Sequence, residues 1–227
     1  MDTIAIENKT IPALGFGTWK LKGQVCRQAV EIALEAGYRH IDTADVYGNH
    51  AETGAAIRNS GLDRSDLFVT SKVWRDDLEP QTLKDSTHRF LDELQADYLD
   101  LLLIHWPNSD LDHAAALTAM HELKTEGLIR HCGVSNFTIE LLQELRASIP
   151  DDVVISNNQF ELHPTLFQKD LVDYCKASGI TVTAYSPIGQ GDDLKLEAVT
   201  EIAAAHNCTP AQADQADGYR GNPQELQ

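Results

Sequence analysis

The chain has 227 residues, of which 42% are hydrophobic, and its formal net charge is -17 at pH 7. This length suits one large domain or two small ones, and the negative charge disfavours nucleic acids and anionic membrane surfaces as partners. With no signal peptide and no stretch long enough to span a bilayer, we expect a cytoplasmic protein that acts on a small molecule.

Short apolar runs alternate with longer segments of helical periodicity from about residue 13 onward. A small hairpin is predicted before them, with strands at residues 4–6 and 10–11. Seven further strands are then expected, at residues 13–17, 38–41, 67–71, 99–104, 129–134, 153–158 and 180–184. Between these strands the apolar positions recur every three or four residues, which predicts helices. Such helices are expected around residues 83–94, 141–145 and 194–206.

The strand expected at residues 99–104 is almost entirely apolar, which is typical of a parallel strand buried on both faces. Both an open doubly wound sheet and a closed barrel fit this pattern. The run Gly15-Phe16-Gly17 is followed by Thr18 rather than by the rest of a G-x-G-x-x-G motif, which argues against the dinucleotide-binding doubly wound fold. We therefore predict an α/β fold of the (β/α)8 TIM-barrel class, in which side chains beyond the carboxyl ends of the strands build the site.

The alternation of strands and helices stops close to residue 212. Residues 213–227 are polar, contain Gly and Pro, and show neither helical nor strand periodicity. The prediction is a partial barrel domain over residues 1–212, with the eighth βα unit missing, and a polar, irregular tail over 213–227. Unpaired strand edges in such a barrel favour self-association, although the sequence does not predict an oligomeric state.

Polar side chains follow the predicted strands in succession. They are Asp42, Tyr47, Lys72, His105, Ser135, Asn136, Gln159 and Tyr185. Taken alone, Asp42 is explained by helix capping, Lys72 by solvation at the surface, and His105 by a structural hydrogen bond. A carboxylate, a tyrosine, a lysine and a histidine at the ends of consecutive strands are better explained by one shared site.

Six motifs occur in order along the chain. They are Gly15-Phe16-Gly17-Thr18-Trp19-Lys20, Asp42-Thr43-Ala44-Asp45-Val46-Tyr47-Gly48, Ser71-Lys72-Val73-Trp74, His105-Trp106-Pro107, Gly133-Val134-Ser135-Asn136-Phe137 and Asn158-Gln159-Phe160-Glu161-Leu162-His163-Pro164. Together they resemble the successive signatures of aldo-keto reductases, in the branch similar to 2,5-diketogluconate reductases. The resemblance implies an NAD(P)H-dependent oxidoreductase that reduces aldehyde or ketone carbonyls to alcohols. It implies NADPH as the cofactor and leaves NADH open.

The resemblance also implies a catalytic tetrad of Asp42, Tyr47, Lys72 and His105, with Tyr47 as the general acid. A free tyrosine has a pKa of about 10, which the ammonium group of Lys72, held by Asp42, would lower. His105 would orient the carbonyl. The implied cofactor-binding residues are Gly17, Thr18, Trp19, Asp42, Ser135, Asn136, Gln159, Tyr185, Ser186, Pro187, Ile188 and Gly189. The implied substrate-binding residues are Trp19, Tyr47, Trp74, His105 and Trp106.

Two alternatives from other classes remain open, because the barrel is predicted to lack its eighth unit. The first alternative is an inactive fragment, and the second is a non-catalytic module that binds a cofactor and a partner protein. Nine histidines without metal-ligand spacing and four scattered cysteines predict no metal site. The spread of acidic residues is also typical of a protein from a salt-rich cytoplasm, which we keep as a hypothesis.

Overall fold

The computed structural model describes residues 2–7 and 9–214. The chain divides into two compact units, of which the first contains residues up to 158 together with 179–181, and the second contains 159–178 and the residues from 182 onward. A helical turn that begins at Pro210 includes Ala213 and Asp214. From residue 215 on, the predicted irregular tail lies outside the described residues.

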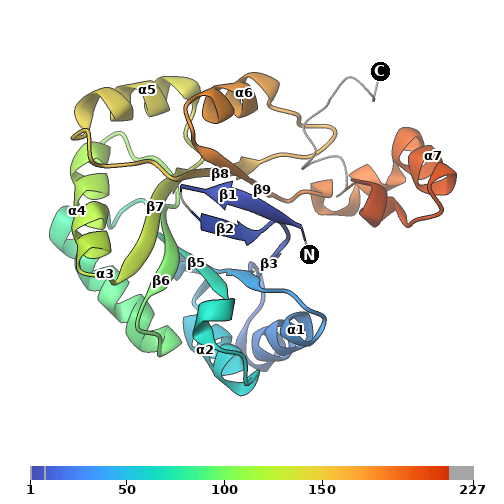
Figure 1. The fold of residues 1–227 in the computed structure, drawn as a ribbon, viewed down its shortest axis with the longest axis horizontal. Helices are drawn as coiled ribbons and strands as arrows, with labels where there is room; N and C mark the ends of the chain where they lie inside the picture. The colour runs from blue at the N-terminus through green and yellow to red at the C-terminus, as the bar shows by residue number, and fades with distance from the viewer. Residues whose placement is uncertain (1, 8, 215–227) are drawn as a thin grey trace. The chain divides into compact units, whose positions relative to one another are not determined.

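The first unit begins with a hairpin and continues as alternating strands and helices (Figure 1). Its strands are β1 (Thr3–Ile6), β2 (Lys9–Pro12), β3 (Gly15–Gly17), β4 (His40–Asp42), β5 (Phe68–Val73), β6 (Leu99–Ile104) and β7 (Ile129–Ser135). Its α-helices are α1 (Gly23–Glu35), α2 (His50–Asn59), α3 (Pro80–Leu94), α4 (His113–Thr125) and α5 (Ile139–Ser148), and its 3-10 helices are η1 (Asp45–Tyr47) and η2 (Arg64–Asp66). Figure 1 shows the α-helices on the outer side of the strands.

Strands β3 to β9 form one seven-stranded sheet in the order of the chain. The pairs from β3 to β7 are all parallel, with Gly17 opposite Asp42 and Lys72 opposite Leu103. Every residue of β5 and β6 is buried, as expected for parallel strands that are covered on both faces. The predicted parallel βα alternation is therefore confirmed, and it places the carboxyl ends of β4, β5, β6 and β7 at one edge of the sheet.

One predicted strand is displaced along the chain. The sequence indicated a strand at residues 153–158, but β8 spans Asn157–Glu161 and residues 153–156 are outside any strand. Val153 and Ile155 are buried all the same, and the Val153 amide donates to the Pro150 carbonyl at 3.1 Å in a turn. The apolar run at residues 153–156 thus predicted burial correctly but predicted a strand wrongly, because a buried connecting segment has the same apolar pattern as a strand.

The hairpin of β1 and β2 packs against the amino-terminal half of the sheet. Ile6 and Ile11 share a buried cluster with Phe68 at the start of β5 and with Leu101 and Leu103 of β6. This contact buries the apolar face of a two-stranded hairpin that is only marginally stable alone.

Glu7, in the turn of this hairpin, connects it to three other segments. Its carboxylate accepts hydrogen bonds from Lys124 of α4 at 3.0 Å, from His131 of β7 at 2.9 Å, and from Ser156. Burial alone raises the pKa of the Glu7 carboxyl, but the hydrogen bonds from Ser156, His131 and Lys124 outweigh it and lower the pKa to about 2. Glu7 is therefore ionised over the whole physiological range of pH.

The second unit contains the end of β8, α6 (Lys169–Ala177), most of β9 (Thr181–Tyr185), η3 (Gly189–Gly191), η4 (Asp193–Lys195) and α7 (Glu197–Ala205). Asp193 organises its loops, because its carboxylate contacts His163 Nδ1 at 2.7 Å and accepts from the Thr165 hydroxyl at 2.8 Å. Gly189 has a φ of +54°, and a Cβ there would lie 2.8 Å from the Asp193 carboxylate. That position accordingly requires glycine.

Residues 2–7 and 9–214 contain neither a membrane-spanning helix nor a cluster of metal-ligand side chains. None of the helices in this range combines the length and the apolar character that a membrane crossing needs. No group of three or more His, Cys, Asp or Glu side chains in the same range is arranged to hold a metal ion.

Candidate active site

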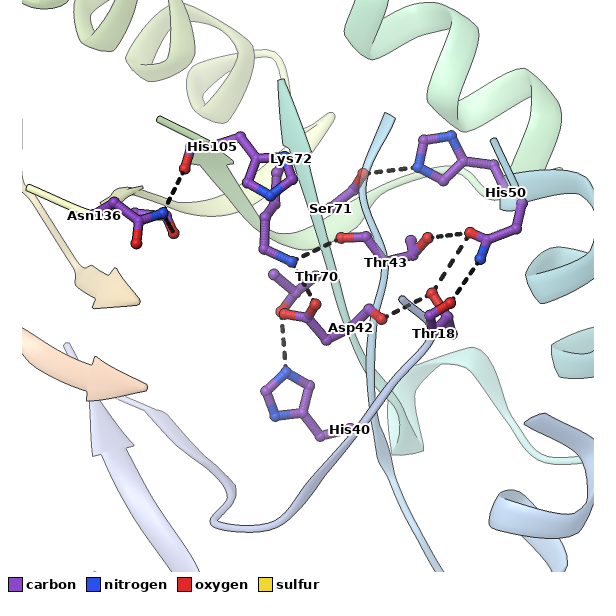
Figure 2. A network of polar contacts seen from close by, with 12 residues as sticks. Thr18, His40, Asp42, Thr43, His50, Thr70, Ser71, Lys72, His105 and Asn136 are labelled. Carbon is purple, nitrogen blue, oxygen red and sulfur yellow. Dashed lines mark hydrogen bonds and ion pairs between the residues drawn. The ribbon is translucent and has the colours of Figure 1, made fainter. Parts of the chain in front are cut away.

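Lys72 and Asp42 form an ion pair at the carboxyl ends of β5 and β4 (Figure 2). The Lys72 side chain is only 1% exposed, and its Nζ also donates to the Thr43 carbonyl oxygen at 3.0 Å. An ammonium group is removed from water at a cost of several kcal/mol unless a carboxylate and hydrogen bonds compensate it. Asp42 and Thr43 supply this compensation, so the positive charge is held at a fixed point.

Tyr47 lies beside this charge. It ends the short 3-10 helix η1, is half-buried, and its ring centroid is 5.3 Å from Lys72 Nζ. Its backbone carbonyl accepts a hydrogen bond from Lys22 Nζ, and its amide donates to the Ala44 carbonyl at 3.1 Å. These bonds fix the turn, so that the phenol ring stays close to the Lys72 ammonium group.

His105 completes the group of four predicted catalytic side chains. Its ring lies edge-on to Tyr47, with centroids 5.7 Å apart, and edge-on to Trp74 at 5.4 Å. Burial, with a smaller contribution from the Lys72 charge, lowers the pKa of His105 to about 4. The ring is therefore neutral at pH 7. Among the described residues its buried Nδ1 has no hydrogen-bond partner.

Ser135 is the last residue of β7 and Asn136 follows it, and Figure 2 shows Asn136 next to His105. Asn136 has a left-handed backbone with a φ of +64°, and its Nδ2 donates to the His105 carbonyl and to Ser135 Oγ, both at 3.0 Å. A hydroxyl and a carboxamide are complementary in type to the donor and acceptor of a nicotinamide carboxamide. The residues present at this strand end thus fit the cofactor that the sequence predicts.

Asn49 was not singled out by the sequence, yet it organises the loops around the site. It is fully buried, accepts a hydrogen bond from the Thr43 hydroxyl at 2.7 Å, and donates to the Thr18 carbonyl at 3.0 Å and the Leu21 carbonyl at 3.1 Å. Thr18, predicted to line the cofactor channel, is also fully buried, and its hydroxyl donates to the Asp42 carbonyl at 3.1 Å. The position of Asn49 between Tyr47 and a helix was the only signal in the sequence.

The remaining predicted residues divide between the two units. Gly17 ends β3, Trp74 is partly buried, and Trp19 and Trp106 are 52% and 40% exposed. These residues belong to the first unit, together with the tetrad. The second unit contains the other predicted cofactor-binding residues, which are Gln159, Tyr185, Ser186, Pro187, Ile188 and Gly189.

Within the second unit, these residues lie on β8, at the end of β9 and in the turn that follows it. Gln159 is buried on β8, and Tyr185 is half-buried at the end of β9, where burial raises the pKa of its phenol. Ser186 has a left-handed φ of +48° and accepts a hydrogen bond from the Gly189 amide at 2.8 Å. A tight turn therefore follows β9, and the assignment of this turn to the cofactor remains a prediction.

A model of the aldo/keto reductase family matches residues 13–213. The chain therefore belongs to the aldo/keto reductase family, whose members are oxidoreductases that use nicotinamide cofactors to reduce carbonyl groups. Membership confirms both the predicted family and the predicted class of enzyme.

Curated relatives and a solved structure extend this result. The chain is 44% identical to the methylglyoxal reductase DkgB of Salmonella typhimurium over 205 residues, covering 89% of this chain and 76% of the relative. It is 42% identical to the glyoxal reductase of Bacillus subtilis, covering 93% and 76%. The aldose reductase structure from Schistosoma japonicum matches with a TM-score of 0.89 at 35% identity, over 95% of this chain and 78% of the other. The structural match confirms the predicted TIM-barrel class.

Proposed function

We propose that this protein is an NADPH-dependent reductase of small carbonyl compounds, in which Tyr47 donates the proton to the carbonyl oxygen. The observation that supports this most strongly is the buried Lys72–Asp42 ion pair beside the ring of Tyr47. A fixed positive charge stabilises a phenolate, and so lowers the cost of proton donation by a tyrosine.

When bound, the nicotinamide cofactor would supply the hydride that the carbonyl carbon requires. Tyr47 transfers its phenolic proton to the carbonyl oxygen, so that the carbonyl becomes an alcohol and Tyr47 becomes a phenolate. The Lys72 ammonium stabilises that phenolate, and Asp42 keeps the ammonium charged and in place. A proton from solvent then restores the phenol before the next turnover.

His105 orients the substrate in this proposal. Its pKa of about 4 keeps the imidazole neutral, so that one ring N–H donates a hydrogen bond to the carbonyl oxygen without competing with Tyr47 for the proton. Trp19, Trp74 and Trp106 supply apolar surface for the substrate. In the first unit, Ser135 and Asn136 would hold the nicotinamide, and Gly17, Thr18 and Trp19 would line the cofactor site. The family resemblance assigns Gln159, Tyr185 and the turn at residues 186–189 of the second unit to the same cofactor.

The substrate class that we propose is small dicarbonyl compounds. Two relatives that are more than 40% identical to this chain have names that refer to glyoxal and methylglyoxal. Such substrates are short, and their reactive aldehyde carbonyl requires little more than an orienting donor and a proton source. Methylglyoxal is therefore the first substrate to test.

The proposal is tested with Tyr47→Phe. We expect the kcat for methylglyoxal with NADPH to fall by at least about 10²-fold, because a positioned general acid contributes 10² to 10⁴. NADPH binding, followed by quenching of tryptophan fluorescence, should be unchanged. Tyr38→Phe is the matched control, because Tyr38 packs edge-on against Phe16 and lies outside the tetrad.

The outcome separates the three functional classes. Activity retained in Tyr47→Phe would contradict the role of Tyr47. Saturable NADPH binding without reduction of any carbonyl would instead favour a non-catalytic cofactor-binding module. Folded protein without NADPH binding would favour an inactive fragment.

A further inference from the structure

His50, the first residue of α2, is buried behind the predicted catalytic tetrad and uses both of its ring nitrogens. Its side chain is 1% exposed, Nδ1 lies 2.9 Å from Glu93 Oε2 of α3, and Nε2 lies 2.8 Å from Ser71 Oγ of β5. The ring packs against Phe90 with centroids 4.8 Å apart. His50 therefore joins a helix to a strand through two short contacts, one of which is drawn in Figure 2.

The chemistry of the partners fixes the tautomer. An ionised carboxylate only accepts hydrogen bonds, so Nδ1 carries the hydrogen that is donated to Glu93. Burial is the main cause that lowers the pKa of His50, which favours the neutral ring. In that ring Nε2 has no hydrogen and accepts from the Ser71 hydroxyl. The neutral ring, with its single N–H, therefore satisfies both contacts. Rotation of the ring would break a buried hydrogen bond.

Ser71 is the residue directly before Lys72 in β5. Successive side chains of a strand point to opposite faces, so Lys72 points toward Asp42 while Ser71 points toward the covering helices. A contact that fixes Ser71 therefore fixes the backbone from which Lys72 projects.

The same contacts continue to the turn that carries Tyr47. On α3, Arg89 lies one turn before Glu93, and its Nη1 is 3.4 Å from Glu93 Oε1. The same Nη1 donates to Asp45 Oδ1 at 2.8 Å, and this hydrogen bond is the main cause that raises the pKa of Arg89. Asp45 is the first residue of η1, which ends at Tyr47.

We propose that His50 is a positioning residue for the Tyr47–Lys72 pair. Through Ser71 it holds the strand that carries Lys72, and through Glu93 and Arg89 it holds Asp45 and the turn that carries Tyr47. Asp42 and Thr43 hold Lys72 from inside the sheet, and His50 holds the same segments from the helix side.

This inference rests on the proposed roles of Tyr47 and Lys72. It concerns the distance between the Lys72 ammonium and the Tyr47 phenol, because the effect of the charge on the phenol weakens as the two groups separate. A displacement of about 1 Å in an active site can cost up to roughly 10²-fold in rate. Relaxation of one of two supports is a smaller change, so we expect about a tenfold loss.

The test uses His50→Ala, which removes both contacts, and Ser71→Ala, which removes only the contact to β5. His50→Gln is the conservative variant, because its terminal amide can reach Ser71 from the position of Nε2. His88→Gln is the matched control, because His88 is exposed on the same helix as Arg89 and Glu93. Thermal unfolding of each variant verifies that it is folded.

The readouts are the pH profile of kcat and the ultraviolet titration of Tyr47, measured as the difference between each variant and the same variant with Tyr47→Phe. For His50→Ala and Ser71→Ala we expect kcat to fall about tenfold, KM to change less than twofold, and the Tyr47 titration to move to higher pH. His50→Gln should recover part of both effects. His88→Gln should show neither.

The titration keeps this inference separate from the proposed function, because it needs no turnover. An inactive wild-type protein, or an active Tyr47→Phe variant, would contradict the proposed function and leave the titration result to decide the role of His50. A Tyr47 titration that is the same in wild type, His50→Ala and Ser71→Ala would overturn the positioning role. Should His50→Ala fail to fold, the Ser71→Ala result decides alone.

Discussion

The four residues of the tetrad differ in how the protein controls their charge. Asp42 and the Thr43 carbonyl both contact the buried Lys72 ammonium, whereas His105 is neutral because burial and the nearby ammonium both oppose its protonation. The same low-dielectric surroundings therefore accommodate the Lys72 ammonium but disfavour an imidazolium at His105. The difference is that Lys72 has a carboxylate partner. Only a lysine with its own carboxylate can serve as the positive charge of this site.

The low pKa of His105 predicts how stability depends on pH. Above pH 6.5 the ring is neutral in both the folded and the unfolded state, and it contributes nothing. Below pH 6.5 His105 is protonated in the unfolded chain, but in the native state it stays neutral until about pH 4. The free energy of unfolding therefore falls as the pH falls. The full difference corresponds to about 3 kcal/mol.

This is tested by measuring the free energy of unfolding between pH 7 and pH 4 for the wild type and His105→Gln. The variant has no titrating ring at this position, so its stability should fall less steeply over this range. His88→Gln, which changes an exposed histidine, should keep the steepness of the wild type. Equal slopes in all three proteins would show that His105 is not held neutral in the folded state.

At the scale of elements, the close approach of α2 to the end of α3 sets the position of the helix that begins with His50. A Cβ added at Gly54 of α2 would lie 2.2 Å from the Leu94 carbonyl oxygen and 2.7 Å from its carbonyl carbon. Arg58, one turn further along α2, donates to the same Leu94 oxygen at 2.7 Å. The two helices are thus in backbone contact, and no side chain can act as a spacer between them.

Gly54→Ala is therefore expected to destabilise the protein, although alanine is the better helix former. The added methyl group meets rigid backbone, so the helices must separate, at a cost of about 1 to 3 kcal/mol that exceeds the gain of about 1 kcal/mol in helix propensity. Urea unfolding measures the change. Gly17→Ala is the control, because a Cβ at Gly17 meets nothing within 4 Å. A Gly54→Ala variant as stable as the wild type would contradict the backbone contact.

Much of the element order was predictable from the sequence, because parallel strands buried on both faces are continuous apolar runs. β6 was predicted with its observed bounds for this reason. The position of β8 was not predictable in this way, because Val153 and Ile155 form an apolar run that is buried outside any strand.

The site was predictable to a similar degree. Residues at the ends of neighbouring parallel strands must meet, which groups Asp42, Lys72 and His105 without any knowledge of tertiary contacts. Asn49 and His50 were missed because their importance depends on partners that are distant in the sequence. His50 contacts Ser71 and Glu93, which are 21 and 43 residues away. No local pattern reports such pairs.

At the scale of the whole molecule, the dominant property is the net charge of -17. Like charges distributed over one folded chain repel each other, and the repulsion is relieved when the chain unfolds and expands. Ion pairs among the described residues, such as Glu7 with Lys124, relieve part of this repulsion locally. Exposed pairs of this kind contribute little to stability. Mobile ions from solution are the more general compensation.

The midpoint of thermal unfolding should therefore rise as NaCl is increased from low concentration to about 0.5 M, where screening is nearly complete. A gain of about 1 kcal/mol corresponds to roughly 2 to 4 °C for a chain of this size. The same titration at pH 5 is the control, because the sequence pI is about 4.7 and the net charge there is small. An equal rise at both pH values would indicate a general salt effect rather than relief of repulsion.

The contacts of Glu7 have a consequence for synthesis of the chain on the ribosome. Its partners Lys124, His131 and Ser156 are separated from it by 117, 124 and 149 residues. Contacts of such long sequence separation slow folding, and they cannot form until the partner residues have been translated. The hairpin is therefore translated before the residues that hold it, and its contacts are completed only after Ser156 has been made. Until Leu103 has been translated, Ile6 and Ile11 lack part of the apolar cluster that buries them.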